Sequence, residues 1–258
     1  MEDNIKRLVG ITLVSNGLEL GYPFVPCIKN MLECCDEVCV NTDVNNRDDT
    51  LAVLKSLDNG RLHIIEREWD YSVNMGKDLD VQPNHCIDFF RTKKSGPTSI
   101  LYLQADEIVD PDEINLLKDS KHFDICEINA YLSRVYFWKD LQHVNTTWTM
   151  PLARLCTLDD ELEVIQEGMT LKHSKKCKSI YPPHDMASIR HYSRIGDSKT
   201  IAKRLNNLDS LFHEEEEYTP LEDYEFGENN NFEPNAAGAQ VVDSYVSHPP
   251  FVEDFYND

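Results

Sequence analysis

The sequence lacks three features that would each assign it to a particular class of protein. No apolar run approaches the about 18 residues that a membrane-spanning helix needs, so we expect no integral membrane segment. The opening Met-Glu-Asp-Asn-Ile-Lys contains no apolar stretch of the kind found in signal peptides, which favours a cytoplasmic protein. No Cys-x-x-Cys pair occurs, although this pair is typical of zinc sites.

Basic residues are absent from the last fifth of the chain. Residues 205–258 hold 14 of the 46 acidic residues and no Lys or Arg, and the whole chain carries a formal charge of −21. Such a field repels nucleic acid in general, because phosphate binding relies on Lys and Arg. The basic stretch at residues 172–178 leaves a local phosphate contact open.

Eight cysteines are present, and their settings favour reduced thiols. Several lie in apolar runs, such as Cys39 between two valines and Cys126 after Ile125. Buried thiols of this kind suit a cytoplasmic chain better than disulfides do. A zinc site built from Cys34, Cys35 and Cys39 is the alternative, but the spacing matches no standard zinc pattern.

The first half of the chain alternates strand-like and helix-like segments. Apolar, β-branched runs predict strands near residues 7–14, 37–42, 62–66 and 98–104, and amphipathic spacing predicts helices at residues 23–35, 49–57 and 82–91. This alternation predicts an α/β fold with a central, mainly parallel sheet flanked by helices. Ligands of such sheets bind beyond the carboxyl ends of the strands.

The second half is less regular. We expect strands within residues 124–137 and 147–156 and a helix at 197–211. Residues 1–205 then form one catalytic domain. Residues 206–258 form an acidic segment that we interpret as a long loop or insertion packed back on the same domain.

Two acids follow the apolar strand that begins near residue 98. Asp106 and Glu107 come directly after Gln104-Ala105 at the carboxyl end of this strand. Carboxylates in this position can hold a hard divalent cation, which would bridge the phosphates of a nucleotide ligand. The structural alternative is a strand that simply leads into a helix started by Asp110-Pro111. The residues alone leave both interpretations open.

At this point the chain resembles a known group. The segment Leu103-Gln104-Ala105-Asp106-Glu107 is similar to the Asp-x-Asp-type segment of GT-A glycosyltransferases related to family two. The resemblance implies a GT-A-like (Rossmann-like) fold and inverting sugar transfer from a nucleotide-sugar donor, with UDP the favoured nucleotide. It implies Mn²⁺ or Mg²⁺ as cofactor, held by Asp106. Gln104 replaces the first acid of the pattern and weakens the case for a metal.

Two further segments resemble the nucleotide-binding part of the same family. Residues 11–16 resemble the strand that cradles the base, which implies contacts from Ser15 and Asn16. Residues 37–43, followed by Asp49, resemble the second strand and its turn, where an Asp corresponding to Asp43 accepts hydrogen bonds from uracil or ribose. Gln104 and Ala105 complete the implied donor site.

The segment at residues 189–194 resembles the family's His-Tyr element. The resemblance implies that His191 ligates the metal, so we expect Asp106 and His191 to share one cation. Arg194, Lys199, Lys203 and Arg204 follow, and cationic side chains beside a diphosphate stabilise its charge.

The general base is the hardest residue to assign. An inverting transferase needs a carboxylate that deprotonates the attacking hydroxyl. We favour Glu167, because Gly168 permits a tight loop, and keep Asp160 as the alternative. Near the end, residues 245–250 resemble a terminal His-Pro element found in some relatives.

Three other functions remain open. The first is a nonenzymatic nucleotide-binding or interaction module on a degenerate transferase scaffold, for which Gln104 is the main argument. The second is a nucleotidyltransferase, but the basic Gly-rich loop expected after the first strand is missing at residues 15–19. The third is sugar transfer onto modified bases of DNA. The acceptor is otherwise a glycan or a small molecule, and the sequence does not identify it.

Overall fold

The computed structural model describes residues 6–71, 76–93, 96–119, 124–147, 150–173, 176–183, 185–212, 241–244 and 248–257. The strands in these ranges are β1 (Arg7–Val14), β2 (Glu37–Asp43), β3 (Leu62–Arg67), β4 (Thr98–Tyr102), β5 (Glu107–Val109), β6 (Ile128–Asn145), β7 (Leu152–Thr157), β8 (Glu163–Ile165), β9 (Thr170–Lys172), β10 (Lys178–Ile180), β11 (Ser188–Ile195) and β12 (Val241–Asp243). The helices are α1 (Phe24–Cys34), α2 (Thr50–Ser56), α3 (Asp78–Thr92), α4 (Pro111–Lys118), α5 (Ser198–Ser210) and α6 (Pro250–Asn257).

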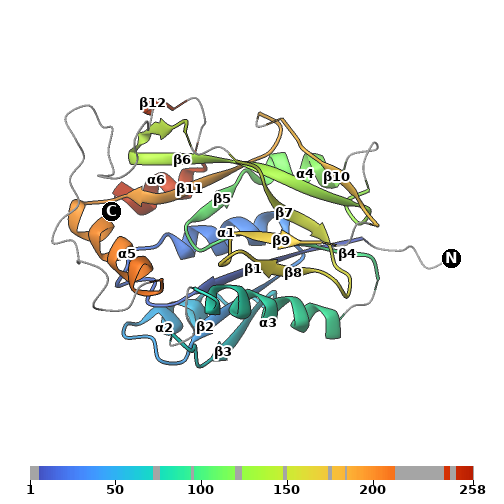
Figure 1. Cartoon of the computed structure of the whole chain (residues 1–258), viewed down its shortest axis with the longest axis horizontal. Helices are drawn as coiled ribbons and strands as arrows, with labels where there is room; N and C mark the ends of the chain where they lie inside the picture. The colour runs from blue at the N-terminus through green and yellow to red at the C-terminus, as the bar shows by residue number, and fades with distance from the viewer. Residues whose placement is uncertain are drawn as a thin grey trace.

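One large mixed sheet organises the molecule (Figure 1). Its strand order is β3-β2-β1-β4-β7-β6-β11-β5, and β10 and β12 also pair with β6. The four strands from β3 to β4 are mutually parallel, whereas β7 is antiparallel to both of its neighbours. The expected GT-A-like α/β arrangement is therefore confirmed, with a parallel core formed by the four predicted strands.

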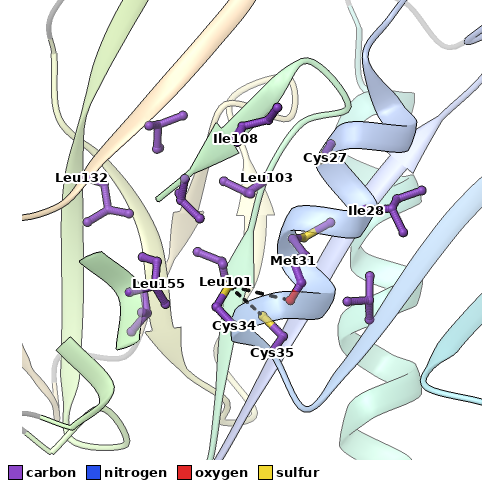
Figure 2. Close-up of a cluster of buried hydrophobic side chains, with 14 of the residues drawn as sticks. Cys27, Ile28, Met31, Cys34, Cys35, Leu101, Leu103, Ile108, Leu132 and Leu155 are labelled. Atoms are coloured by element: carbon purple, nitrogen blue, oxygen red, sulfur yellow. Dashed lines mark hydrogen bonds between the residues drawn. The ribbon is translucent and has the colours of Figure 1, made fainter. Parts of the chain in front are cut away.

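The parallel strands are apolar on both faces because helices cover both. Along β1, Val9 and Ile11 belong to the core on the α3 side, whereas Leu8 belongs to the core on the α1 side. Figure 2 shows the α1 side, where Met31 lies near Leu101 of β4. A strand buried on both faces is expected to be a continuous apolar run, and this is why the sequence revealed these strands.

The helices follow the sequence prediction with shifts at their ends. The third helix begins at Asp78, four residues earlier than expected, with Asp78 and Asp80 in its first turn. Acidic side chains are favourable there because they face the positive end of the helix dipole. The structural alternative for the acidic pair is observed, since Asp110 caps α4 by accepting a hydrogen bond from the backbone N–H of Asp112, and metal binding stays a prediction.

The C-terminal residues that the structure describes pack on the same core. Helix α6 contacts α1, and Val252 is fully buried. Helix α5 runs through residues 205–206, where we expected the catalytic part to end. Most of the acidic segment, residues 213–240, lies outside the described residues.

The cysteines are all free thiols, and six of the eight are buried. No set of three His, Cys, Asp or Glu side chains within the described residues is arranged to hold a metal ion, so the zinc alternative gains no support. Every helix in these ranges also falls short of the length and apolar character that crossing a bilayer demands.

Candidate functional site

A cavity of about 480 Å³ opens at the carboxyl ends of β1 and β4. Its walls come from the ends of these two strands, the loop after β3, strands β6 and β11, the turn before β9 and helix α5. The lining residues are Leu13, Val14, Ser15, Asn16, Leu20, Tyr22, Trp69, Tyr71, Leu79, Gln104, Ala105, Asp106, Arg134, Tyr136, Glu167, Met169, His191, Ser193, Arg194, Arg204, Asn207, Leu208, Leu211 and Phe212.

The loops after β1 and β2 are joined through a pair of asparagines. The backbone N–H of Asn16 donates to Asn46 Oδ1 at 2.6 Å, and Asn16 Oδ1 accepts from the N–H of Arg47 at 2.7 Å. Asn16 has a φ of 50°, a left-handed conformation that Asn tolerates better than most residues. The two loops are thereby fixed against each other, with Ser15 and Asn16 on the cavity wall.

Asp43 lies behind Tyr71 at the end of β2. Its Oδ2 accepts a hydrogen bond from the Tyr71 hydroxyl at 2.8 Å, and its Oδ1 accepts one from the N–H of Asn45 at 2.9 Å. The Tyr71 hydroxyl also lies 2.8 Å from Ser15 Oγ. Asp43 is 1% exposed and does not line the cavity, whereas Tyr71 and Ser15 do. The carboxylate therefore positions the groups that face the cavity.

Trp69 forms an aromatic part of the same wall. Its indole Nε1–H donates to Asn41 Oδ1 at 2.9 Å, and its ring lies 6.2 Å from that of Tyr71. Both side chains follow β3 in a segment that we did not single out in the sequence. Aromatic side chains at the carboxyl edge of a parallel sheet suit stacking against a planar base.

Glu107 is the centre of a buried ion-pair network beneath the cavity. It is fully buried, and its Oε1 accepts hydrogen bonds from Arg134 Nε at 2.7 Å and from Arg154 Nη2 at 2.9 Å. Although burial opposes it, these two guanidinium groups hold the pKa of Glu107 below its ordinary value. Glu107 is therefore a structural anion and is not available to a metal.

Gln104 links this network to the opposite wall. Its side-chain carbonyl accepts from Arg134 Nη2 at 2.7 Å, and its Nε2–H donates to the backbone carbonyl of Gly168 at 3.1 Å. An amide can do both, whereas the acid that the family pattern expects here could only accept. Ala105 lies beside it on the cavity floor.

Asp106 and His191 meet, as we expected. Their Oδ2 and Nε2 atoms are 3.5 Å apart, although 85 positions separate them in the chain. Burial, together with the neighbouring Glu107, raises the pKa of Asp106 to about 6. Burial and four nearby arginines hold the pKa of His191 well below its ordinary value, so the imidazole is neutral.

Glu167 projects from a strained loop at the rim of the cavity. Gln166, Glu167 and Gly168 have φ values of 58°, 60° and 76°, so three consecutive residues are left-handed. Asp80 Oδ1 accepts from the N–H of Gly168 at 2.8 Å, and the Tyr102 hydroxyl donates to its carbonyl at 2.7 Å. Backbone strain held in place by surrounding contacts supports a functional role for such a segment.

Four candidate residues lie away from the cavity. Asp49 is exposed at the start of α2, and Asp160 is exposed in the turn before β8. Lys199 and Lys203 are exposed on the outer face of α5, where they stand one turn apart. None of the four lines the cavity. The described part of the basic stretch at 172–178 also lies elsewhere, on β9 and β10.

Arg134 and an apolar patch, neither of which we assigned, complete the walls together with the expected Arg194 and Arg204. Arg134 enters from β6, and Arg204 enters from the inner face of α5. An apolar patch of Leu79, Met169, Leu208, Leu211 and Phe212 surrounds the rim near Glu167. Arg204 follows the buried Ile201 by three positions, so helix periodicity places it on the inner face of α5.

No protein-family model and no curated protein sequence matches the chain. Solved structures do match its fold. One is S. aureus TarS 1-349 in complex with UDP-GlcNAc, with a TM-score of 0.46 and 13% identity over 80% of this chain and 66% of that one. The same protein in complex with UDP gives a TM-score of 0.36 and 16% identity over 50% of this chain and 36% of that one.

A further match is a putative glucose-1-phosphate thymidylyltransferase from Bacillus anthracis, with a TM-score of 0.30 and 11% identity over 53% of this chain and 56% of that one. The chain spans less than two thirds of the length of these solved chains. The α/β fold that we expected is observed in the sheet order itself, and these low-scoring likenesses add no argument to it. At such identities and scores the ligands remain properties of those proteins.

Proposed function

We propose that the protein is a glycosyltransferase that moves a sugar from a nucleotide-sugar donor, UDP-linked, to a hydroxyl acceptor. One observation carries the proposal: a single cavity brings together Ser15, the Gln104–Asp106 segment, His191 and Glu167 from four separate parts of the chain. Nucleotide binding, charge stabilisation and proton removal each need one of these groups. Their convergence at the carboxyl edge of the sheet supports one reaction site.

The nucleoside binds at the end of the cavity formed after β1 and β3. Tyr71 and Trp69 offer aromatic faces to the base, and Ser15 and Asn16 offer polar groups. Asp43 acts through Tyr71, whose hydroxyl it holds. This arrangement differs from the direct contact between Asp43 and the nucleotide that the family resemblance implies.

The transfer itself requires one proton acceptor and a stabilised leaving group. Glu167 takes the proton of the acceptor hydroxyl as its oxygen attacks the anomeric carbon, and the bond from that carbon to the donor diphosphate breaks. The charge that develops on the diphosphate lies near the arginine side of the cavity, where positive charge stabilises it. Direct displacement of this kind inverts the configuration at the anomeric carbon.

A divalent cation, Mn²⁺ or Mg²⁺, fits between Asp106 and His191 when the donor is present. The neutral His191 has its Nδ1 beside Ser193 Oγ, which leaves Nε2 directed towards Asp106. These two ligands supply one negative charge, because Gln104 is neutral and Glu107 is engaged by arginines. The cation would neutralise charge on the diphosphate, whose oxygens would complete its coordination.

Calorimetry with the purified chain tests the proposal. Uridine diphosphate sugars are titrated with and without Mn²⁺, and donor turnover is then followed by release of UDP with candidate glycans and small hydroxyl compounds as acceptors. We expect at least one nucleotide sugar to bind the chain and to release UDP when a suitable acceptor is present. Failure of every nucleotide sugar to bind contradicts the proposal.

A nucleotide-binding module without catalysis is the second candidate. The replacement of an acid by Gln104, together with the engagement of Glu107 by Arg134 and Arg154, favours it, because the protein charge available to a metal is low. Binding of a nucleotide sugar with no turnover, either by hydrolysis or by transfer, would select this candidate. A modified DNA base remains a third acceptor for the transferase.

A further inference from the structure

Arg204 is a buried cation whose guanidinium is held by backbone carbonyl groups. Its side chain is 3% exposed, and its guanidinium donates hydrogen bonds to five backbone carbonyl oxygens. The bond from Nε to the carbonyl of Leu20 is 2.7 Å, and the bond from Nη1 to that of Ile195 is 2.8 Å. Among the residues that the structure describes, no carboxylate forms an ion pair with it.

The backbone is arranged around this side chain. Gly21 has a φ of 62°, and a Cβ atom there would lie 3.0 Å from Thr200 Cγ2 and 3.3 Å from Arg204 Nη2. The carbonyls satisfy the donors of the guanidinium, but they leave its whole positive charge in place. A buried charge is costly unless an opposite charge compensates for it, so this arrangement favours an anion nearby.

Arg204 lines the cavity, where arginines outnumber carboxylates. Arg134 and Arg194 also line the cavity, and Arg154 lies beneath it, against the carboxylates of Asp106, Glu107 and Glu167. This excess of positive charge stands out in a chain with a net charge of −21.

We propose that Arg204, with Arg194 beside it, forms a fixed cationic site that binds the diphosphate of the donor before and without a divalent cation. The inference rests on the proposed function and specifies how its donor is held. The diphosphate of a nucleotide sugar is dianionic, and it supplies a counter-charge to Arg204, which forms no ion pair with a carboxylate of the described residues. A metal then adds to a complex that the arginines have already formed.

The ligands available to the expected metal support binding of the diphosphate before the metal. Of the neighbouring acids Asp106 and Glu107, Asp106 alone remains available to a metal, and Arg134 lies beside it and bonds to both Gln104 and Glu107. A cation entering the empty cavity would face the arginines, whereas a diphosphate would be attracted to them. The anion is therefore expected to enter first.

The test compares UDP with uridine, because the two differ by the diphosphate alone. Each is titrated calorimetrically into the full chain in the presence of EDTA and then with Mn²⁺. We expect UDP to bind at least about tenfold more tightly than uridine in EDTA, with a gain that falls as salt rises. Arg204→Gln should abolish most of that gain while uridine affinity stays unchanged.

Lys203→Gln is the matched control. It removes the same charge from the neighbouring position, but Lys203 is exposed and lies away from the cavity, so the UDP gain should persist. Uridine binding and the thermal midpoint check that each variant is folded. Arg204→Lys keeps the charge and should retain part of the gain, so it serves as the second variant if the glutamine variant does not fold.

Two outcomes overturn the inference. If UDP exceeds uridine only when Mn²⁺ is present, the arginines do not hold the diphosphate, although the proposed function stands. If Arg204→Gln binds UDP in EDTA as tightly as the unaltered chain does, Arg204 is a structural clamp between α5 and the loop before α1. Absence of any nucleotide binding would overturn the proposed function together with the inference.

Discussion

The side-chain amide of Gln104 donates a hydrogen bond to the backbone carbonyl of Gly168, with 3.1 Å between Nε2 and O. This bond joins the end of β4 to the strained loop that carries Glu167. The same side chain accepts a hydrogen bond from Arg134. The position where the family pattern places an acid therefore connects the arginine side of the cavity to the expected base.

Gln104→Glu should disturb this connection. A carboxylate has no hydrogen to donate to the Gly168 carbonyl, so the loop loses one of its supports and two oxygens face each other. We expect a stability loss of roughly 1–3 kcal/mol and a lower turnover rate with little change in donor affinity. Urea unfolding and steady-state kinetics measure both. Gln142→Glu, an exposed position, is the matched charge control and should behave like the unaltered chain.

Asp43→Ala should weaken binding of uridine nucleotides by roughly 1–3 kcal/mol, the scale of losing one partner of a buried polar contact. The loss should arise through Tyr71, because Asp43 holds that hydroxyl and does not line the cavity. Tyr71→Phe, which keeps the ring, should reproduce part of the loss. Unchanged affinity of the Asp43 variant by calorimetry would remove this residue from the site.

Glu167→Gln should lower the turnover rate by a factor of about 10² to 10⁴, the range that general base catalysis contributes. Donor affinity should remain, because the amide keeps the shape of the side chain. Asp160→Asn is the matched control, since this acid is exposed and does not line the cavity. The assignment is wrong if the two variants lose activity equally or if Asp160→Asn alone does.

Asp106→Asn and His191→Ala should each abolish Mn²⁺ binding that depends on the donor. The two side chains are 3.5 Å apart at their nearest nitrogen and oxygen, which is short enough for two ligands of one ion. Electron paramagnetic resonance of Mn²⁺, with UDP present, measures the bound metal. A variant that still binds the ion as the unaltered chain does would exclude a shared metal site.

Stability should fall as the pH drops below the ordinary His value of 6.5, in part because burial lowers the pKa of His248. The folded protein keeps this imidazole neutral, with its Nε2 at 2.8 Å from the carbonyl of Leu141. The unfolded chain binds the proton at a higher pH, so acid favours unfolding. His248→Gln should reduce the loss between about pH 7.5 and about pH 5.5 in urea titrations. An equal loss in both proteins would contradict this role.

The parallel half of the fold could be predicted because its strands are buried on both faces. The strand predicted near residues 37–42 is observed at Glu37–Asp43. Its apolar run from Val38 to Val40 is buried throughout, so the sequence marks it clearly as a strand of the core. Strand β6 could not be delimited in this way. It continues to Asn145, and its second half mixes buried and exposed positions.

Site residues that belong to a recognisable motif could be predicted from the sequence. Residues that only the fold brings to the site could not. Asp106 and His191 lie 3.5 Å apart, as expected, and the metal that they would share stays a prediction. Arg134 was missed because nothing in the sequence around β6 marks it as facing Gln104. Lys199 and Lys203 were chosen for their charge, yet the apolar face of α5, with Ile201 and Ala202, directs them outward and Arg204 inward.

Reaction of a buried thiol can report local unfolding of this protein. Cys27 lies beneath the floor of the cavity, with its Sγ 3.4 Å from the carbonyl oxygen of Gln104. Burial raises the pKa of this thiol well above its ordinary value, so the reactive thiolate forms only when the floor of the cavity opens. The rate of Cys27 alkylation, followed by mass spectrometry, would therefore measure local unfolding at the site separately from that of the whole domain.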